Sequence, residues 1–332
     1  MMKKSHPKIC LVIPVFNEGS HILHSLKRIE EEVIKVTLNY EIIVVDDGST
    51  DDTWMKLSED KGVLPNNLFV IKFSRNFGKE AALVAGLEHA NGQAVIIMDA
   101  DLQHPPSLIS EMVNRWKDED IGIVECVKRE RGKENLRYRL GTKLFYWIVR
   151  RMTGYDLKGA SDYKLLDQKV VHAWKQMPER DTFFRGMTAW LGFKKVQYEF
   201  NVSPRVNGEP KWSTPKLIKL ALNAVVSFTS LPLRFVSILG FLFFIAAIFL
   251  GIHTLYQKFN GNALTGFTTV ILLQLIIGSV FMISLGVIGE YISAIYKEVK
   301  GRPRYLIENT VVSEVVTYEK EAEDLNAEFV KV

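Results

Sequence analysis

Two aspartates near residue 100 stand where a metal-binding site would need them. Asp99 and Asp101 follow an apolar, strand-like run at residues 94–98, and Gln103 lies two residues further on. Mg²⁺ and Mn²⁺ are hard ions that choose oxygen donors and usually leave coordination positions to substrate phosphates. These three residues therefore predict a site for Mg²⁺ or Mn²⁺ that would neutralise a diphosphate leaving group. We expect the adjacent His104 to pack beside this site rather than to bind the ion.

A second acidic pair, Asp46 and Asp47, ends another apolar run at residues 41–45. An Asp-Gly turn of this kind is usually structural when it stands alone. In open α/β sheets, however, ligands bind outside the carboxyl ends of the strands, and both acidic groups follow strand-like runs. We therefore expect both groups to face one ligand-binding edge.

This edge has no glycine-rich phosphate cradle. The first apolar run, residues 9–15, is followed by Phe16-Asn17-Glu18-Gly19 rather than by the G-x-G-x-x-G of a dinucleotide-binding domain, and no Walker A sequence occurs. A phosphate-bearing ligand would therefore depend more heavily on the metal.

Apolar runs alternate with amphipathic stretches in the part of the chain that carries these groups. Ile22, Leu26, Ile29 and Val33, for example, recur at helical spacing. We predict strands at residues 9–15, 41–45, 68–73, 94–98 and 121–127. We predict helices at residues 18–36, 50–60, 78–90 and 105–117, the last with proline in its first turn. This alternation indicates an α/β domain with a mostly parallel sheet.

Two uncharged apolar runs follow, at residues 235–256 and 267–289. At 1.5 Å per helical residue, each is long enough to cross a hydrocarbon core about 30 Å thick. The loop between them, residues 257–266, carries only Lys258. Basic residues flank the pair on its other side: Lys216, Lys219, Arg234, Lys297, Lys300, Arg302 and Arg304. The positive-inside rule then predicts that both termini are cytoplasmic, and the polar residues 1–8 are not a signal peptide.

Composition narrows the class of protein. The net charge of +4 suits a surface that faces anionic lipid, and no long basic run interleaved with aromatics suggests a nucleic-acid binder. Cys10 and Cys126 are expected to be buried free thiols in a reducing compartment. Basic and apolar residues at 129–151 and 213–232 predict helices lying on the membrane surface. The acidic tail beyond Glu308 is expected to be partly disordered.

Three ordered motifs carry a family resemblance. Val12-Ile13-Pro14-Val15-Phe16-Asn17-Glu18, Val44-Val45-Asp46-Asp47-Gly48-Ser49 and Asp99-Ala100-Asp101-Leu102-Gln103-His104-Pro105-Pro106 resemble the family 2 glycosyltransferases of the GT-A fold. The two spans narrow the resemblance to the polyprenyl-phosphate glycosyltransferases, such as dolichol-phosphate mannose synthase and the bactoprenol glucosyltransferases. It covers about residues 8–305. It implies a cytoplasmic GT-A domain at 1–212, an interface helix at 213–232, transmembrane helices at 233–256 and 267–296, and a cytoplasmic tail at 297–332.

The resemblance also implies roles for individual residues. Arg205 and Lys211 match a basic loop that closes on the donor diphosphate, although a basic loop that simply faces the membrane would look the same. For Arg75 two roles stay open, a structural one and a contact with the donor phosphate. The implied donor-binding residues are Pro14, Val15, Glu18, Asp46, Asp47, Arg75, Ala100, Arg205 and Lys211.

The acceptor would be a lipid monophosphate, for which Arg139 falls best in register with the family's acceptor arginine and Arg129 second. Relatives often read Gly-Asp-Phe-Arg-Leu where this chain reads Ser161-Asp162-Tyr163-Lys164-Leu165. Asp162 is then the family's candidate catalytic base, beside Asp99 and Asp101. A phosphate monoester with a second pKa near 6 is already mostly anionic at pH 7, so Asp162 can instead orient the acceptor or bind a sugar hydroxyl. Arg185 is a further candidate for donor contact.

Together these features predict an inverting, metal-dependent sugar transfer from UDP-glucose to undecaprenyl phosphate at a bacterial inner membrane, by a homo-tetramer. GDP-mannose or a UDP-N-acetylhexosamine could replace the donor. The alternative outside the enzymes is a non-enzymatic membrane scaffold. The intact acidic and basic motifs argue against it, because a scaffold does not need them. A processive synthase would usually carry Gln-x-x-Arg-Trp, which is absent, and a transporter would need more spans.

Overall fold

The chain folds into two compact units in a computed structural model that describes residues 7–59, 64–117, 121–128, 151, 161–180, 182–200, 231–260 and 266–313. One unit comprises Met1–Arg139, Leu157–Pro210 and Pro303–Val332, and the other comprises Leu140–Asp156 and Lys211–Arg302. The predicted interface helices, 129–151 and 213–232, lie outside the described residues apart from a few terminal positions.

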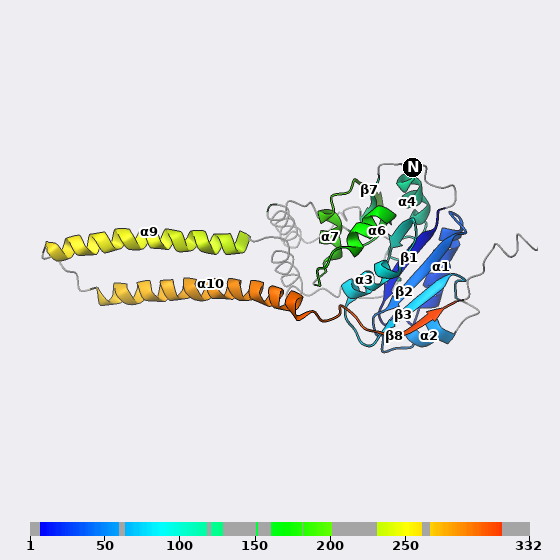
Figure 1. Ribbon diagram of the computed structural model, residues 1–332, viewed down its shortest axis with the longest axis horizontal. Helices are drawn as coiled ribbons and strands as arrows, with labels where there is room; N and C mark the ends of the chain where they lie inside the picture. The colour runs from blue at the N-terminus through cyan, green and yellow to red at the C-terminus, as the bar shows by residue number, and fades with distance from the viewer. Residues whose placement is uncertain are drawn as a thin grey trace, which may run out of the picture. The chain divides into compact units, whose positions relative to one another are not determined.

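The first unit is built on an eight-stranded sheet, within the described residues, in the order β7-β5-β6-β4-β1-β2-β3-β8 (Figure 1). The central strands β4, β1, β2 and β3 are parallel, whereas β6 runs antiparallel to both β4 and β5. The expected mostly parallel α/β sheet is thus confirmed. The strands are β1 (Ile9–Val15), β2 (Tyr40–Asp46), β3 (Leu68–Phe73), β4 (Ala94–Ile97), β5 (Ile123–Lys128), β6 (Lys164–Asp167), β7 (Lys195–Phe200) and β8 (Ile307–Val312).

Helices cover both faces of the central strands, which explains their nearly continuous apolar sequence. On β1, Leu11 and Ile13 join the core with α1 and α4, while Val12 packs against Gly86 of α3 on the other face. A side chain at Gly86 would lie 2.2 Å from Val12, so glycine allows the close approach of α3. The helices are α1 (Ile22–Ile34), α2 (Thr53–Glu59), α3 (Lys79–His89), α4 (Leu108–Trp116), α6 (Gln168–Lys175) and α7 (Phe184–Trp190).

Several helix starts differ from their prediction. The helix expected at 105–117 begins at Leu108, because the segment before it forms turns in which Leu108 and Ile109 donate to the carbonyls of Pro105 and Pro106. Similarly, α1 and α2 begin three or more residues later than predicted, after loops closed by side-chain hydrogen bonds such as that from the Thr50 nitrogen to Asn17 Oδ1. These loops belong to the ligand-binding edge.

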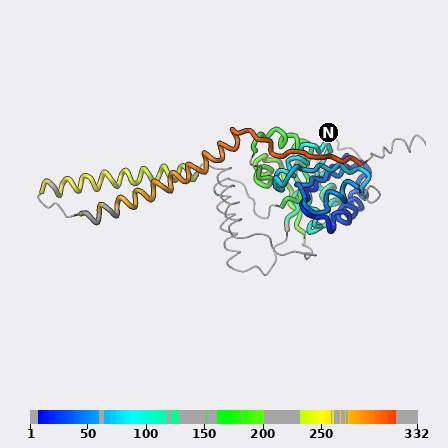
Figure 2. Tube along the Cα trace, turned by 90° about the horizontal axis from the view of Figure 1, so that it is seen from below, coloured from blue at the N-terminus to red at the C-terminus, as the bar shows by residue number. Residues whose placement is uncertain are grey.

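The C-terminal tail contributes one strand to the sheet. Residues 309–312, expected to be partly disordered, belong to β8, which pairs antiparallel with β3. Tyr305 stacks on Phe73 with ring centroids 4.9 Å apart, and Ser313 Oγ accepts a hydrogen bond from the Leu68 nitrogen. The β-branched residues Ile307, Val311 and Val312 suit a strand that pairs with an open sheet edge, and the segment runs along the first unit in red in Figure 2.

The second unit contains α9 (Leu231–Phe259) and α10 (Phe267–Lys300), which lie side by side (Figures 1 and 2). Their most apolar segments, Pro232–Gln257 and Leu273–Lys300, have mean hydropathies of 2.8 and 2.0 and are not buried by protein. A helix that is apolar all round and uncovered is typical of a membrane span. The two predicted spans are therefore confirmed as candidates. Helix α10 ends at Lys300, and Gly301, with a left-handed φ of 67°, forms its C-terminal cap.

Candidate active site

Asp99 and Asp162 meet because β6 runs antiparallel to β4. Ile97 pairs with Lys164, so continuing the register by two residues brings Asp99 opposite Asp162. Lys79, the first residue of α3, reaches between them: its Nζ lies 2.5 Å from Asp99 Oδ1 and 3.0 Å from Asp162 Oδ2. Three segments distant in sequence thus place two carboxylates around one ammonium group.

Asp162 has a second cation. Arg185 of α7 donates to it through Nε, 2.7 Å from Oδ1, and through Nη2, 3.0 Å from Oδ2. Such a two-pronged guanidinium contact is among the stronger charged hydrogen bonds. Burial raises the pKa of Asp162, but the hydrogen bonds and charges of Arg185 and Lys79 outweigh it and hold that pKa well below its usual range. Asp162 is therefore ionised and forms ion pairs with two cations, Lys79 and Arg185.

Two of the three residues predicted to hold a metal, Asp99 and Asp101, lie together beside this ion-pair cluster, and the third possible ligand beside them is His104, which we expected only to pack there. Ligand atoms of Asp99, Asp101 and His104 all fall within 4.8 Å of one another. Asp101 is held by its own turn, in which its Oδ1 accepts the Gln103 nitrogen at 3.0 Å, and Leu102 adopts a positive φ of 53° to form that turn. Two carboxylates with this spacing fit Mg²⁺ or Mn²⁺.

His104 is buried behind the acidic pair. Its ring packs against Tyr163 and Phe200, with centroids 5.1 and 6.0 Å away, and its Nδ1 lies 3.9 Å from Asp99 Oδ2. The Tyr163 hydroxyl also donates to the carbonyl of Pro105. These contacts anchor the loop that carries Asp99 and Asp101.

Asp46 and Asp47 occupy the same edge, next to β1. Asp47 accepts hydrogen bonds from the nitrogens of Phe77 and Gly78, at 2.7 and 2.9 Å, and so holds the loop that leads to Lys79. Asp46 accepts the Ser49 nitrogen through Oδ1, whereas its buried Oδ2 has no hydrogen-bond partner among the residues that the structure describes. Burial raises the pKa of both carboxyls. Asp47 thus organises the site, and Asp46 keeps one acceptor oxygen.

The other described residues predicted to bind the nucleotide-sugar donor lie near Asp46 at the same edge of the sheet. Val15 pairs with Asp46 across β1 and β2, with Pro14 beside it, and both Val15 and Ala100 are buried. Glu18 is half-buried and bonds His21, while the exposed Arg75 guanidinium lies 4.1 Å above the Phe77 ring. The structure therefore brings these predicted residues to one edge. Four other candidates, Arg129, Arg139, Arg205 and Lys211, lie outside the described residues.

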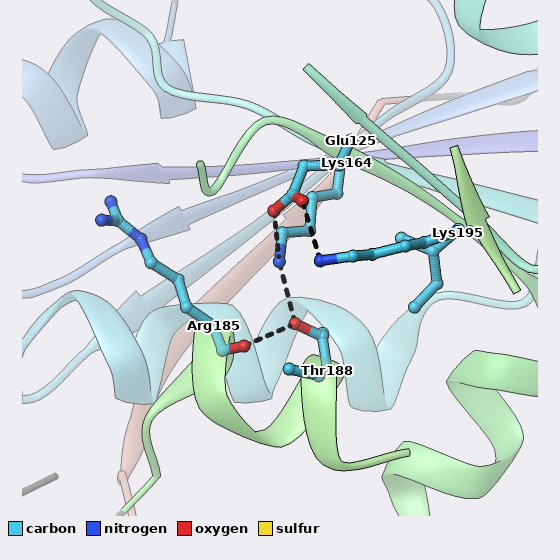
Figure 3. Close-up of a pocket in the computed structure, with 7 residues that line it drawn as sticks. Glu125, Lys164, Arg185, Thr188 and Lys195 are labelled. Carbon is cyan, nitrogen blue, oxygen red and sulfur yellow. Dashed lines mark hydrogen bonds and ion pairs between the residues drawn. The ribbon is translucent and has the colours of Figure 1, made fainter. Parts of the chain in front are cut away.

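A second charged cluster lies behind the site, inside the protein. Lys164 of β6 is 3% exposed, bonds Glu125 of β5 at 3.0 Å and donates to Thr188 Oγ1 of α7 at 2.9 Å (Figure 3). The Thr188 hydroxyl in turn contacts the Arg185 carbonyl, while the Arg185 guanidinium points away from the cluster (Figure 3). Burial opposes the charge of Glu125, but Lys164 and its other partners lower its pKa. A small cavity of about 10 Å³ adjoins this cluster, whose rim includes Lys195.

Glu80 of α3 holds the start of α7. Its Oε2 accepts the Phe184 nitrogen at 2.8 Å. Burial raises the pKa of Glu80 to about 7. Helix α7, which presents Arg185, is therefore pinned by charged groups on α3 and on β6.

Comparison with known proteins identifies the family. Residues 10–171 match the description Glycosyl transferase family 2, and residues 231–295 match GtrB C-terminal hairpin. The chain is 38% identical to an uncharacterised glycosyltransferase of Synechocystis, over 94% of this chain and 98% of that protein. The chain is a family 2 glycosyltransferase.

This transferase is also 34% identical to a prophage bactoprenol glucosyl transferase homologue of Escherichia coli, over 90% of this chain and 98% of the relative. It is 34% identical to the bactoprenol glucosyl transferase of Shigella phage SfII, over 91% and 98%. Among solved structures, a mannosyltransferase of Pyrobaculum calidifontis in complex with GDP-Man and Mn²⁺ matches with a TM-score of 0.45 and 23% identity, over 62% of this chain and 58% of that one.

Sequence reasoning missed Lys79 and Glu80 at the candidate site and the buried Glu125–Lys164 pair behind it. One signal was present: Lys79 follows a glycine at the start of a predicted helix, directly after Arg75-Asn76-Phe77. A second was Glu125, a charged residue within an apolar strand. Neither signal predicts which residue the charge pairs with, because the partners lie on other strands and helices.

Proposed function

We propose that this glycosyltransferase transfers a hexose from a nucleotide-sugar to a polyprenyl phosphate, with UDP-glucose and undecaprenyl phosphate as the best candidates. The observation that carries the proposal is the Asp99–Lys79–Asp162–Arg185 cluster, at the carboxyl edge of a family 2 domain whose chain also holds two candidate spans. Relatives named bactoprenol glucosyl transferases support the same acceptor class. GDP-mannose and UDP-N-acetylhexosamines are the alternative donors.

The reaction is an inverting displacement. An oxygen of the lipid phosphate attacks the anomeric carbon, the bond from that carbon to the nucleoside diphosphate breaks, and the diphosphate leaves with the electron pair. An α-linked donor then becomes a β-linked sugar phospholipid. When bound at Asp99 and Asp101, with Gln103 as a further oxygen donor, Mg²⁺ or Mn²⁺ supplies positive charge to the leaving diphosphate.

No general base is needed in this scheme. The acceptor monoester, with a second pKa near 6, is mostly dianionic at pH 7. Asp162 is already paired with Lys79 and Arg185, so it is a poor proton acceptor. We assign to Asp162 the positioning of these two cations, or of a sugar hydroxyl, beside the reacting centre.

The other predicted residues complete the proposal. Pro14, Val15 and Glu18 line the nucleoside pocket with Asp46, and Arg205 and Lys211 close on the diphosphate. Arg139, with Arg129 second, binds the acceptor phosphate at the headgroup plane. Residues 1–212 and 297–332 are cytoplasmic at a bacterial inner membrane, and 213–232 lies on its surface. The exposed phenylalanines of α9, such as Phe241 and Phe249, pack between the subunits of a homo-tetramer.

The test is a transfer assay on the purified full chain in detergent. The protein is incubated with Mg²⁺ or Mn²⁺, undecaprenyl phosphate and each of several radiolabelled nucleotide-sugars, and the lipid phase is extracted. We expect label from one donor to enter the lipid and to be lost in Asp101→Ala. The matched control, Glu31→Gln in an exposed pair with Arg28 on α1, should transfer normally. No lipid label from any donor, with nucleotide still bound, would favour a scaffold instead.

A further inference from the structure

The ammonium group of Lys79 lies on one of the carboxylates that the proposed function assigns to the metal. Its Nζ is 2.5 Å from Asp99 Oδ1, the shorter of its two ion pairs. The position is built in rather than incidental, because Gly78, with φ of 101°, turns the chain into α3 and is bonded by Asp47. Lys79 therefore begins a fixed helix directly beside the acidic pair.

The two carboxylates that hold Lys79 differ in what else neutralises them. Asp162 is bonded by the Nε and Nη2 of Arg185, so it keeps a cation if Lys79 moves. Asp99 has a further contact only at 3.9 Å, to the ring of His104, among the ion pairs of the described residues. Asp99 thus depends on Lys79 for its counter-charge, whereas Asp162 does not.

A divalent ion bound to Asp99 would lie close to the Lys79 ammonium group, which is 2.5 Å from Asp99 Oδ1, and the two cations would repel each other strongly. The Lys79 side chain is 41% exposed, so it has room to withdraw while it stays near Asp162. We propose that Lys79 is an internal counter-ion that competes with the divalent metal for Asp99. This inference rests on the metal site of the proposed function. The ammonium neutralises Asp99 when no metal is bound and weakens metal binding by the same interaction.

This role makes an unusual prediction, in which removing a residue of the site improves metal binding. Without Lys79, Asp99 gains the attraction for a cation that the ammonium now satisfies. Lys79→Met should therefore bind Mn²⁺ on the order of tenfold more tightly than the wild type, since the pair is partly exposed and screened. Lys79→Arg keeps the charge and should bind Mn²⁺ close to the wild-type affinity.

The experiment titrates the full chain in detergent with Mn²⁺, without donor, and measures free Mn²⁺ by electron paramagnetic resonance. Lys8→Met is the matched control, because Lys8 is 38% exposed and pairs with Glu41 at 2.9 Å, away from the site. Its Mn²⁺ affinity should equal that of the wild type. Lys79→Gln provides a second neutral variant, and circular dichroism checks that each variant is folded.

Equal or weaker Mn²⁺ binding in folded Lys79→Met and Lys79→Gln would overturn the competition. A tenfold gain in Lys8→Met as well would also overturn it, because the effect would then be one of net charge. If the wild type binds no more Mn²⁺ than Asp101→Ala does, the metal site of the proposed function fails together with this inference. The first two outcomes leave that metal site intact, so the failures are distinguishable.

Discussion

Two lysine–carboxylate clusters lie close together along β6, and they differ mainly in exposure. Lys79 pairs with Asp99 and Asp162 at the open edge of the sheet, with its side chain 41% exposed. Lys164 pairs with Glu125 in the interior, with its side chain 4% exposed. A ligand can compete for the first pair because water reaches it. The second is almost fully buried, so we assign to its charges the holding together of strands and helices.

The largest expected effect is a loss of stability when the buried Lys164–Glu125 pair is broken. Lys164→Met leaves Glu125 buried without its closest cation and removes the donor to Thr188. Loss of one partner of a buried ion pair costs about 3 kcal/mol of the free energy of unfolding. Denaturant unfolding should show this loss, whereas Lys79→Met should cost less than about 1 kcal/mol because its pair is partly exposed.

The double variant Lys164→Met, Glu125→Gln supplies the control. It removes the uncompensated charge, so it should recover part of the lost free energy of unfolding. Equal destabilisation by Lys164→Met and Lys79→Met would contradict the distinction between a buried structural cluster and an exposed functional one.

The second effect concerns the exposed cluster and appears in activity. Asp162→Asn keeps the shape of the side chain but removes the charge that positions Lys79 and Arg185. We expect the rate of lipid labelling to fall about 100-fold, as for the loss of a preorganised electrostatic contact. The thermal midpoint should fall as well, because Asp162 is buried and its charged hydrogen bonds are lost, so the rate is compared at a temperature where the variant is folded. Glu111→Gln, in an exposed pair with Arg115, is the control and should leave the rate unchanged.

A pH-dependent effect follows from Glu80, which follows Lys79 on α3 and bonds the first residue of α7. Burial raises its pKa to about 7 in the folded protein, while a free glutamate titrates near pH 4.3. Between these values the folded state binds a proton that the unfolded state does not, so stability falls as pH rises. The free energy of unfolding should decrease by about 3 kcal/mol from pH 4.5 to 7 on this account.

Glu80→Gln tests this assignment, because it keeps an acceptor for the Phe184 nitrogen without a titrating group. Thermal unfolding midpoints measured from pH 4.5 to 8 should lose this part of their pH dependence in the variant. An unchanged pH profile would show that another group is responsible.

The smallest expected effect lies at the rim of the buried cluster. Lys195 is 38% exposed and 3.6 Å from Glu125, so it adds little to the pairing that Lys164 provides. Lys195→Met should lower the free energy of unfolding by less than about 1 kcal/mol, measured as for Lys164→Met. A loss as large as that of Lys164→Met would show that exposure does not separate these ion pairs.

Local sequence patterns predicted much of this protein. The apolar runs around β1 to β4, the aspartates that end β2 and β4, and the apolar helices α9 and α10 are encoded by neighbouring residues. Periodicity and composition act over a few turns or one strand, so they can be read without the partner elements. The three motifs likewise identified the family that the relatives confirm.

Only the tertiary structure decided which charges meet. Asp162 faces Asp99 because β6 runs antiparallel to β4, and Arg185 reaches it because α7 is pinned by Lys164 and Glu80. The same holds for β8, which pairs with the edge of β3, a strand far away in the chain. These contacts join segments that are far apart in the chain, and strand order and direction, which select such partners, leave no local pattern in the sequence.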